Sequence, residues 1–561
     1  MTFPAVLQPR HVAWLLLALI VIWFGNLEYR KLIKPDEGRY AEIPREMVVS
    51  GNWVTPRLNG IKYFEKPPLQ YWATAVAYEV FGQHQWTARL WPALTGLLGI
   101  FGAWLAGLLL FGPLAGFYAA VVLGSSLIYV FIAHINTLDM GVSFFMGAVL
   151  WAFLLAQRDD APPAATRLWM HVAWAAMALA MLSKGLIGIA LPGAVLVLYS
   201  LIERDWALWK RLHLTTGLIL FVVITAPWFV LVQLKNPEFS QFFFVHEHFK
   251  RFLTPVAHRT QPWWYFFPIL FAGLVPWLIT FFDALPRAWR GDASAARFRP
   301  LRLCLIWAVF IYVFFTLSDS KLPSYILPIW PALALIIGWR LSRISGRALS
   351  WHTAIFIVIG IALMVAAPLA PRFASAHVPR ALFVDYVPWL LAAGAVLAAG
   401  SAIACILSRH QHFTAAVTVF AFGGLLFTQL LLTGHNSFAP TSSTYAIAQK
   451  IKPYLRPGAP FYSVGTYYQT LDFYIKRTVT VVAFRDELSF GLDQEPQLGI
   501  PDYATFERLW RKTPYALAIM TPETYGKMEQ ARLPMQVIAR DTRRVVVRTP
   551  PSAGKEGDAT Q

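Results

Sequence analysis

The stretch Leu69-Gln70-Tyr71-Trp72-Ala73-Thr74-Ala75-Val76-Ala77-Tyr78-Glu79-Val80-Phe81-Gly82 decides the fold, because counting it as a membrane span reverses the orientation of every later segment. A helix needs about 20 mainly apolar residues to cross a hydrocarbon core of ~30 Å. This stretch is shorter, contains Glu79, and follows a loop too polar to extend it. We therefore predict that it lies in or re-enters the membrane interface without spanning the bilayer.

The composition indicates an integral membrane protein. Hydrophobic residues make up 57% of the chain and charged residues only 14%, which is more apolar surface than one soluble core can bury. Arg10 precedes the first apolar run and no small-residue cleavage site follows it, so we expect a retained anchor. Thirteen spans are predicted, at roughly 12–28, 89–111, 113–133, 138–156, 168–184, 186–203, 213–233, 263–283, 302–317, 322–338, 351–370, 386–407 and 413–434.

Basic residues predict the orientation of these spans. With Leu69–Gly82 excluded, the short loops on the side of the N-terminus contain Arg158, Arg167, Arg204, Lys210, Arg211, Arg287, Arg290, Arg297, Arg299, Arg302, Arg340, Arg343, Arg347 and Arg409. The positive-inside rule makes that side cytoplasmic. External loops 29–88 and 234–262 then belong to a membrane domain of residues 1–434, and the rest of the chain is external too.

Residues 435–550 are predicted to form a mixed α/β domain outside the membrane, followed by a disordered tail at 551–561. The two cysteines, Cys304 and Cys405, fall within predicted spans, so we expect no disulfide in this domain. Helical patterns cover Thr444–Lys452 and Tyr503–Lys512. Alternating runs predict strands at Phe461–Val464, Val479–Ala483, Ala516–Met520, Gln536–Ala539 and Val545–Thr549.

The net charge of +18 is only partly explained by the cytoplasmic loops, because the external loops are basic as well. Positive charge at an outer membrane surface favours anionic partners such as phosphorylated lipids. Nucleic acid is not an expected partner of an integral protein. For any single lysine or arginine, anchoring to lipid headgroups is the alternative interpretation.

Acidic residues follow the first span directly, in Lys34-Pro35-Asp36-Glu37-Gly38-Arg39-Tyr40-Ala41-Glu42. Ionised groups so close to a membrane boundary need water, a partner or a substrate to compensate them. A helix that begins after Pro35 is the structural alternative, since its dipole favours Asp36 and Glu37.

The first external loop resembles that of a glycosyltransferase family. After Asp36-Glu37-Gly38-Arg39-Tyr40 come Glu42-Ile43-Pro44-Arg45-Glu46-Met47, Gly51-Asn52-Trp53-Val54-Thr55-Pro56 and Phe64-Glu65-Lys66-Pro67-Pro68-Leu69. These strings are similar to bacterial lipid A aminoarabinose transferases and their protein O-mannosyltransferase-like relatives of the GT-C class. The resemblance covers about residues 10–435. It implies a GT-C-like bundle of about 13 transmembrane helices and a polyprenyl-phosphate-linked sugar donor. It also implies that Asp36 is the acidic catalytic residue of this loop.

Further site residues are expected on the same side of the membrane. Asp139 ends the short turn His134-Ile135-Asn136-Thr137-Leu138-Asp139 and is similar to the second acid of the class, although an Asp that begins a helix is common. Glu65 is a third catalytic candidate, and Lys66 a candidate for donor binding. A surface ion pair between these two neighbours is the alternative.

Lysines in tight loops are candidates for binding the donor phosphate, because an ammonium group is a compact point charge. Lys184 lies between two spans, and Lys321 belongs to a Lys-Leu-Pro-x-Tyr element that resembles the family's and ends at Tyr325. Arg39 and Tyr40 are further candidates for substrate binding.

The external stretch 239–262 contains His246-Glu247-His248 and Arg251. Histidines at i and i+2 do not share a helix face, which excludes the zinc-protease pattern. Glu65 and His246 are candidate ligands of a weakly bound divalent metal ion, and Arg251 is a candidate for the donor phosphate. The alternative is an amphipathic loop that covers the membrane surface.

The resemblance implies an inverting pentosyltransferase of the bacterial inner membrane. It would move 4-amino-4-deoxy-L-arabinose from undecaprenyl phosphate to a lipid A phosphate at the periplasmic face, which gives resistance to polymyxin and other cationic peptides. We expect a monomer in contact with membrane lipids. One alternative is a protein O-mannosyltransferase, in which Asp36 would be an essential base. Another is a lipid flippase or transporter, although the span centres lack the ionisable groups typical of transporters.

Overall fold

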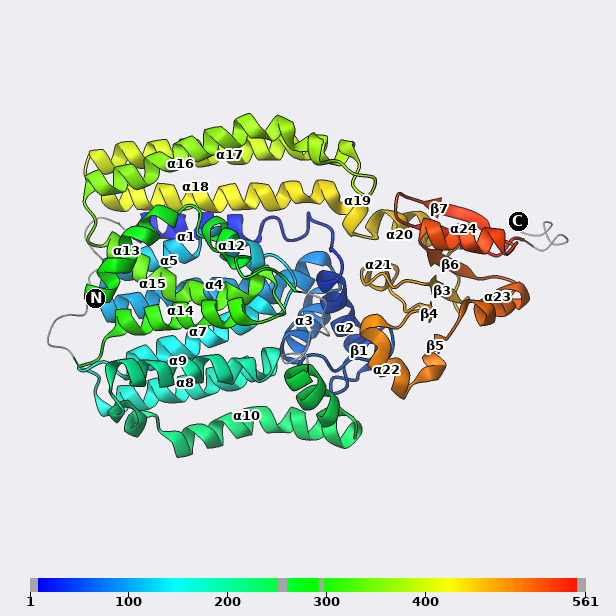
Figure 1. Cartoon of the computed structure of the whole chain (residues 1–561), viewed down its shortest axis with the longest axis horizontal. Helices are drawn as coiled ribbons and strands as arrows, with labels where there is room; N and C mark the ends of the chain where they lie inside the picture. Colours follow the sequence, from blue (N-terminus) through cyan, green and yellow to red (C-terminus); the bar gives the residue numbers. More distant parts are fainter. Residues whose placement is uncertain (1–8, 251–259, 292–296, 552–561) are drawn as a thin grey trace.

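The computed structural model describes residues 9–250, 260–291 and 297–551. The chain forms a long helical bundle with an α/β domain at one end (Figure 1). Within the described residues, nine helices are long and apolar enough to cross a membrane, and two bent helix pairs raise this number to 11. Two shorter apolar helices, Ala13–Phe24 and Ile187–Glu203, correspond to the other two predicted spans. Every predicted span thus coincides with helical structure.

The bundle consists of α1 (Pro9–Phe24), α4 (Gln85–Phe111), α5 (Pro113–Leu123), α6 (Leu127–Ala133), α7 (Asp139–Ala156), α8 (Pro163–Lys184), α9 (Ile187–Glu203), α10 (Leu214–Lys235), α12 (Phe266–Gly273), α13 (Leu278–Gly291), α14 (Pro300–Leu317), η4 (Pro323–Ile329), α15 (Trp330–Leu341), α16 (Gly346–Ala366), η5 (Ala367–Phe373), α17 (Arg380–Arg409) and α18 (Phe413–Gly434). Shorter elements between bundle helices are η1 (Ala207–Arg211) and η2 (Gln241–Lys250). Helix α7 is 83% buried within the bundle, whereas α10 and α16 are largely exposed. The exposed helices therefore present their apolar side chains to lipid.

Two spans are broken at positions that face each other. The pair α5–α6 bends by 64° and the pair α12–α13 by 103°. The amide of Leu127 donates to the carbonyl of Val275 at 3.0 Å, and the indole of Trp277 donates to Ser125 Oγ at 2.9 Å. Since a backbone group without a partner is costly in a membrane, each break supplies partners for the other.

The first external loop contains α2 (Asp36–Ser50), a hairpin of β1 (Arg57–Leu58) and β2 (Ile61–Lys62), and α3 (Leu69–Phe81). Helix α3 is the stretch that decided the topology, and its 13 residues are too few to cross a bilayer. Its outer residues Val76, Val80 and Phe81 are more than half exposed. An apolar exposed face on a short helix fits the predicted position in the membrane interface.

The α/β domain contains a six-stranded sheet in the order β5-β4-β3-β6-β8-β7. Its strands are β3 (Phe461–Val464), β4 (Thr480–Val482), β5 (Gly499–Ile500), β6 (Leu517–Met520), β7 (Gln536–Arg540) and β8 (Val545–Arg548). The first four strands of that order are parallel to one another. Strand β8 is antiparallel to both of its neighbours, β6 and β7. The five strands predicted from alternation are confirmed. Strand β5 was missed, because its two residues carry no alternating pattern.

Short helices connect and cover the strands of this domain. They are η6 (His435–Phe438), α19 (Ala439–Ser442), α20 (Tyr445–Ile451), η7 (Lys452–Tyr454), α21 (Leu471–Ile475), η8 (Asp486–Leu488), α22 (Ser489–Gln494), η9 (Pro496–Leu498), α23 (Tyr503–Lys512) and α24 (Pro522–Gln530). Helices α20 and α23 confirm the two predicted helical stretches. The other helices have at most nine residues, too few for the sequence to show a helical period. The predicted tail lies outside the described residues from 552 onward.

The sheet shares a hydrophobic core with the first external loop. Buried side chains of that loop, such as Tyr40, Met47 and Tyr71, form one cluster with Phe461 and Leu471 of the domain. The other face of the sheet packs against α23 and α24 in a separate cluster. The domain therefore packs directly on α2 and α3.

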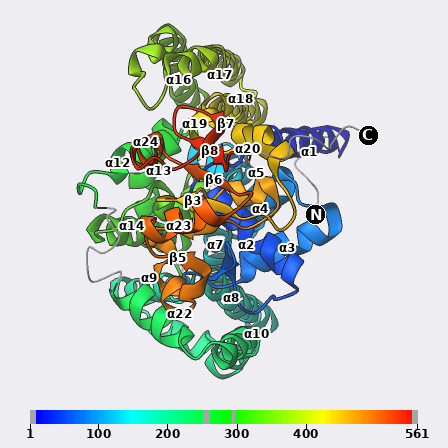
Figure 2. The ribbon, with the colours of Figure 1, turned by 90° about the vertical axis from the view of Figure 1, so that its right-hand side faces the viewer.

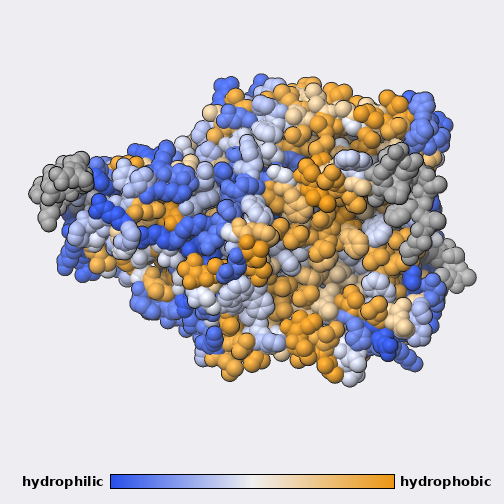
Figure 3. Space-filling model, turned by 180° about the vertical axis from the view of Figure 1, so that it is seen from behind, coloured by the Kyte–Doolittle hydropathy of each residue, from blue (hydrophilic) through white to orange (hydrophobic). Residues whose placement is uncertain are grey.

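One glycine shows how closely these two regions approach. A Cβ atom on Gly38 in α2 would lie 2.5 Å from the carbonyl carbon of Gln469 and 2.6 Å from the amide of Thr470. Viewed from the domain, the sheet lies across the middle of the bundle end, with α10 and α16–α17 at opposite margins (Figure 2). The surface of the bundle is mostly apolar, whereas the domain is largely polar (Figure 3).

Candidate active site

Two acids begin helices at the bundle end that carries the α/β domain. Asp36 is the first residue of α2, and Asp139 is the first residue of α7. The interpretation of each acid as the start of a helix is therefore confirmed, and a helix N-terminus favours negative charge. The catalytic roles of the two acids stay predictions. The Asp36 side chain is 37% exposed, against 13% for Asp139. Asp36 is thus the more accessible of the two.

Asp139 lies close to residues of two other elements at the bundle end. Its carboxylate forms an ion pair with Lys184 at the end of α8, and Ser324 in η4 donates to Asp139 Oδ2 at 3.0 Å. Lys184 Nζ also lies 4.9 Å from the centre of the Tyr325 ring, which is a cation–π distance. The predicted residues Asp139, Lys184 and Tyr325 are therefore brought together.

Arg39 connects Asp36 to the α/β domain. Its guanidinium lies 3.1 Å from Asp36 Oδ1 and forms a second ion pair with Glu487 in η8. Burial raises the pKa of the Glu487 carboxyl, and the charge of Arg39 opposes that shift. Sequence reasoning missed Glu487, because no motif surrounds it and it lies far from Arg39 along the chain. The domain thus supplies a charged group to the site.

Tyr40 is influenced by acids from both clusters. Burial raises the pKa of its hydroxyl, and the negative charges of Asp36, Glu65 and Asp139 act in the same direction. Asp36 also interacts electrostatically with Lys184. The groups around Asp36, Glu65 and Asp139 therefore form one electrostatic unit, although they come from distant parts of the sequence.

A buried ion pair connects α2 to α4 beside these residues. Arg89 in α4 and Glu37 in α2 are both fully buried, with Arg89 Nε 2.7 Å from Glu37 Oε1. Glu37 also accepts hydrogen bonds from the amides of Ile33 and Asn136, each at 3.0 Å. Burial alone would raise the pKa of Glu37, but Arg89, Arg30 and these amides lower it.

The position of this pair explains its importance for the site. Glu37 follows Asp36, and Asn136 lies three residues before Asp139, so one carboxylate connects both acidic segments. Arg89 in turn donates to the carbonyls of Leu27 and Arg30, at 2.7 and 2.6 Å. The pair was not predicted, although a lone arginine at the start of an apolar span is a usable signal.

Comparisons with known proteins agree with this geometry. Residues 447–549 match the aminoarabinose transferase C-terminal domain family, and residues 65–230 match the dolichyl-phosphate-mannose-protein mannosyltransferase family. An undecaprenyl phosphate-alpha-4-amino-4-deoxy-L-arabinose arabinosyl transferase of Erwinia tasmaniensis is 32% identical over 407 residues, which cover 70% of this chain and 71% of the relative. The chain belongs to the aminoarabinose transferase family.

Solved structures place the fold in the same family. The crystal structure of ArnT from Cupriavidus metallidurans bound to undecaprenyl phosphate has a TM-score of 0.93 and 41% identity, and the match covers 97% of this chain and 99% of that one. The apo form of the same ArnT gives a TM-score of 0.90. These matches confirm the predicted GT-C-like fold with its C-terminal α/β domain, and the chain is a multi-pass membrane glycosyltransferase.

Two other predicted lysines of the transferase donate to backbone carbonyls. Lys66 Nζ donates to the backbone carbonyl of Glu65 at 2.8 Å. Lys321 is buried, and its ammonium donates to the carbonyl of Gln261 at 3.1 Å. No hydrogen bond or ion pair within the described residues joins Lys321 to Asp36, Asp139 or Lys184.

The metal prediction is not tested by the described part of the transferase. Arg251 and the side chain of His246 lie outside the described residues. Among the side chains that are described, no group of three or more His, Cys, Asp and Glu residues is arranged to hold a metal ion. The pairing of Glu65 with His246 at a metal ion stays a prediction.

Proposed function

We propose that this transferase moves 4-amino-4-deoxy-L-arabinose from undecaprenyl phosphate to a phosphate group of lipid A. The observation that supports this most is the convergence of Asp36, Asp139, Lys184 and Arg39 at one end of the bundle, in a chain of this family. The matched ArnT structure, which is bound to undecaprenyl phosphate, supports the choice of the lipid carrier. Addition of an amino sugar would reduce negative surface charge and so give resistance to polymyxin.

We place the reaction at the periplasmic face of the bacterial inner membrane. The support is the distribution of charge. The arginine-rich short loops belong to the bundle end opposite the α/β domain, and the positive-inside rule assigns such loops to the cytoplasm. The site and the α/β domain would then face the periplasm.

The chemistry of the donor defines what the site must do. The leaving group is a lipid phosphate, which departs as an anion and needs positive charge around it. Lys66, Lys184, Arg251 and Lys321 are the proposed sources of that charge. Lys184 is held by Asp139, so the proposed role of Asp139 is to position this ammonium group.

Asp36 is the proposed group that acts on the acceptor. A phosphate monoester has a second pKa of ~6, so it is mostly dianionic at neutral pH and needs no strong base. Asp36 would take the last proton, orient the acceptor, or stabilise positive charge on the sugar ring. We propose a single displacement with inversion at the anomeric carbon, and a product of retained configuration would contradict that.

The direct test uses purified protein in detergent with undecaprenyl-phosphate aminoarabinose and lipid A. We expect lipid A to gain one aminoarabinose unit, detected by mass spectrometry, and Asp36→Asn to slow its appearance. The matched control is Asp160→Asn, a change of exposed charge in the loop between α7 and α8. Lipid A that stays unmodified by wild-type protein would contradict the proposed acceptor, and turnover without a sealed membrane would contradict a transporter.

The mannosyltransferase alternative has a specific observation in its favour, because residues 65–230 match that family. There the acceptor is a hydroxyl, whose proton must be removed by a base. Loss of the base would cost about 10²–10⁴-fold in rate. With a phosphate acceptor we expect a smaller loss for Asp36→Asn. The match of residues 447–549 to the aminoarabinose transferase domain favours the phosphate acceptor.

A further inference from the structure

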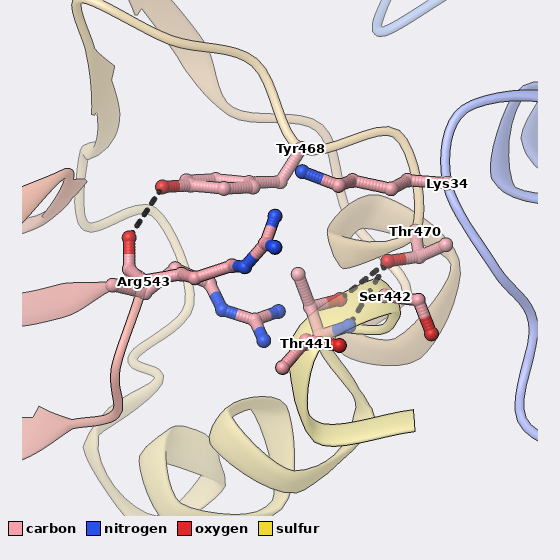
Figure 4. A pocket seen from close by; sticks show the side chains of 8 residues that line it. Lys34, Thr441, Ser442, Tyr468, Thr470 and Arg543 are labelled. Atoms are coloured by element: carbon pink, nitrogen blue, oxygen red, sulfur yellow. Dashed lines mark hydrogen bonds between the residues drawn. The ribbon is translucent and has the colours of Figure 1, made fainter. Parts of the chain in front are cut away.

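A basic pocket lies between the first external loop and the α/β domain, apart from the acids of the active site. Figure 4 shows its lining side chains. They are Lys34, Thr441, Ser442, Thr444, Tyr468, Thr470, Arg543 and Arg544. Within the described residues, none of them forms a hydrogen bond or an ion pair with Asp36 or Asp139.

Four segments build this pocket. Lys34 comes from the loop before α2, and its amide donates to the carbonyl of Ser442 in α19 at 2.9 Å. Tyr468 and Thr470 precede α21, and Thr470 Oγ1 lies 2.9 Å from Thr444 Oγ1. Arg543 belongs to the turn between β7 and β8. The pocket therefore forms only when the α/β domain is packed on the first external loop.

Its three cations outnumber the acids that contact them. Asp541 pairs with Arg544, 2.9 Å from its Nε, whereas Lys34 makes no ion pair within the described residues. Burial lowers the pKa of Lys34, and the charges of Arg543 and Arg544 lower it further. The side chains of Lys34 and Arg543 extend into the same space in Figure 4, and Arg544 also lines the pocket. Like charges that line one pocket repel each other unless an anion lies between them.

Neutral backbone groups hold the two guanidinium groups in place. Arg544 donates to the carbonyls of Ser443 and Pro440, at 2.5 and 2.6 Å. Arg543 donates to the carbonyl of His377 at 3.2 Å, through its Nη2. Carbonyls fix the direction of a cation without neutralising its charge. The two guanidinium groups are thus preorganised for an anion.

We propose that this pocket binds a phosphate monoester, either on a membrane-lipid headgroup or as free phosphate. A monoester is mostly dianionic at neutral pH and presents three acceptor oxygens, which match the three cations of the pocket. The contact between Arg543 and His377 ties the pocket to the loop between η5 and α17, at the membrane-facing side of the domain. The bound anion would connect the catalytic loop at Lys34 to the domain at Arg543.

The test measures anion binding to the full-length protein in nanodiscs of phosphatidylcholine. One arm adds phosphatidic acid to the bilayer, and the other adds inorganic phosphate to the buffer. Binding is measured by native mass spectrometry for the lipid and by calorimetry for free phosphate. The variants are Lys34→Gln, whose side chain is exposed, and Lys34→Gln with Arg543→Gln. The matched control is Arg508→Gln, an exposed arginine of α23 that contacts Thr505.

We expect Lys34→Gln to weaken binding about tenfold, as for the loss of one charge-assisted hydrogen bond, and the double variant to weaken it further. Arg508→Gln should bind like wild type. Saturation by phosphatidic acid alone identifies a lipid headgroup as the ligand, and saturation by inorganic phosphate identifies the free anion. Equal binding of either ligand to wild type and both variants, or no binding to wild type, overturns the proposal.

Discussion

The two ends of the helical bundle handle charge in different ways. At the end opposite the α/β domain, arginines pair with acids of neighbouring loops, as in Arg297 with Asp205 at 2.6 Å and Arg302 with Glu203 at 2.9 Å. The Arg297 side chain stays 64% exposed. At the end that carries the domain, Glu37 and Arg89 are fully buried.

This difference separates charges that orient a membrane protein from charges that build a site. An exposed ion pair contributes about 0–1 kcal/mol, because water solvates either partner alone. Removal of one partner from a buried pair costs about 3–5 kcal/mol, since a buried charge is left uncompensated. Ion pairs of the same residue types therefore have different consequences at the two ends.

The largest expected effect comes from breaking the buried pair. Glu37→Gln leaves Arg89 buried without a counter-charge, and we expect a loss of about 3–5 kcal/mol in stability, together with a loss of activity as the Asp36 and Asp139 segments separate. Thermal unfolding of the detergent-solubilised protein measures the first effect. The matched change at the other end is Arg297→Gln. Similar losses for both variants would contradict the contrast between the two ends.

A smaller effect is expected where the α/β domain contacts the first external loop. Gly38→Ala places a methyl group against the backbone of Gln469 and Thr470, and overpacking of this kind costs about 1–3 kcal/mol. We expect faster proteolysis between the bundle and the domain, and lower activity because Glu487 moves away from Arg39. Gly193→Ala is the control, since a Cβ atom there meets nothing within 4 Å. Unchanged proteolysis of the Gly38 variant would show that the contact is not required.

A third effect depends on pH and concerns Glu46 in α2. Burial and the neighbouring Glu42 raise the pKa of Glu46 to about 8, from its ordinary 4.5. The folded state thus keeps a proton that the unfolded state loses. Its contribution to stability is complete below about pH 4.5 and falls by about 1.4 kcal/mol per pH unit up to about pH 8.

Glu46→Gln is neutral in both states and should remove this slope. We expect the variant to gain melting temperature over wild type as the pH rises towards 8, with little difference near pH 4.5. The exposed Glu529 in α24 provides the control variant, Glu529→Gln. Parallel pH profiles for wild type and the Glu46 variant would exclude Glu46 as the titrating group.

The smallest effect is expected for the exposed pair itself. Arg297→Gln should change stability by less than about 1 kcal/mol, and added salt should reduce that difference further. Thermal unfolding at low and high ionic strength measures both. A large, salt-independent loss would mean that the opposite end also depends on buried charge.

The sequence predicted the spans because each is a continuous apolar run, and it predicted five strands because they alternate. It could not predict β5 or the short helices, which are too brief to show a period. In the site, a local motif or resemblance identified Asp36, Asp139 and Lys184. The partners Arg89 and Glu487 are remote in sequence from Glu37 and Arg39, so only the folded chain brings them together.

The ion pair between Arg39 and Glu487 has a consequence for exchanging parts between related enzymes. The α/β domain supplies the ion-pair partner of Arg39 in the first external loop, and it leaves no room for a side chain at Gly38. A chimaera that takes only its α/β domain from a relative would inherit a mismatched partner for Arg39. Donor specificity of the bundle is therefore best studied in chimaeras that exchange residues 29–88 together with the α/β domain.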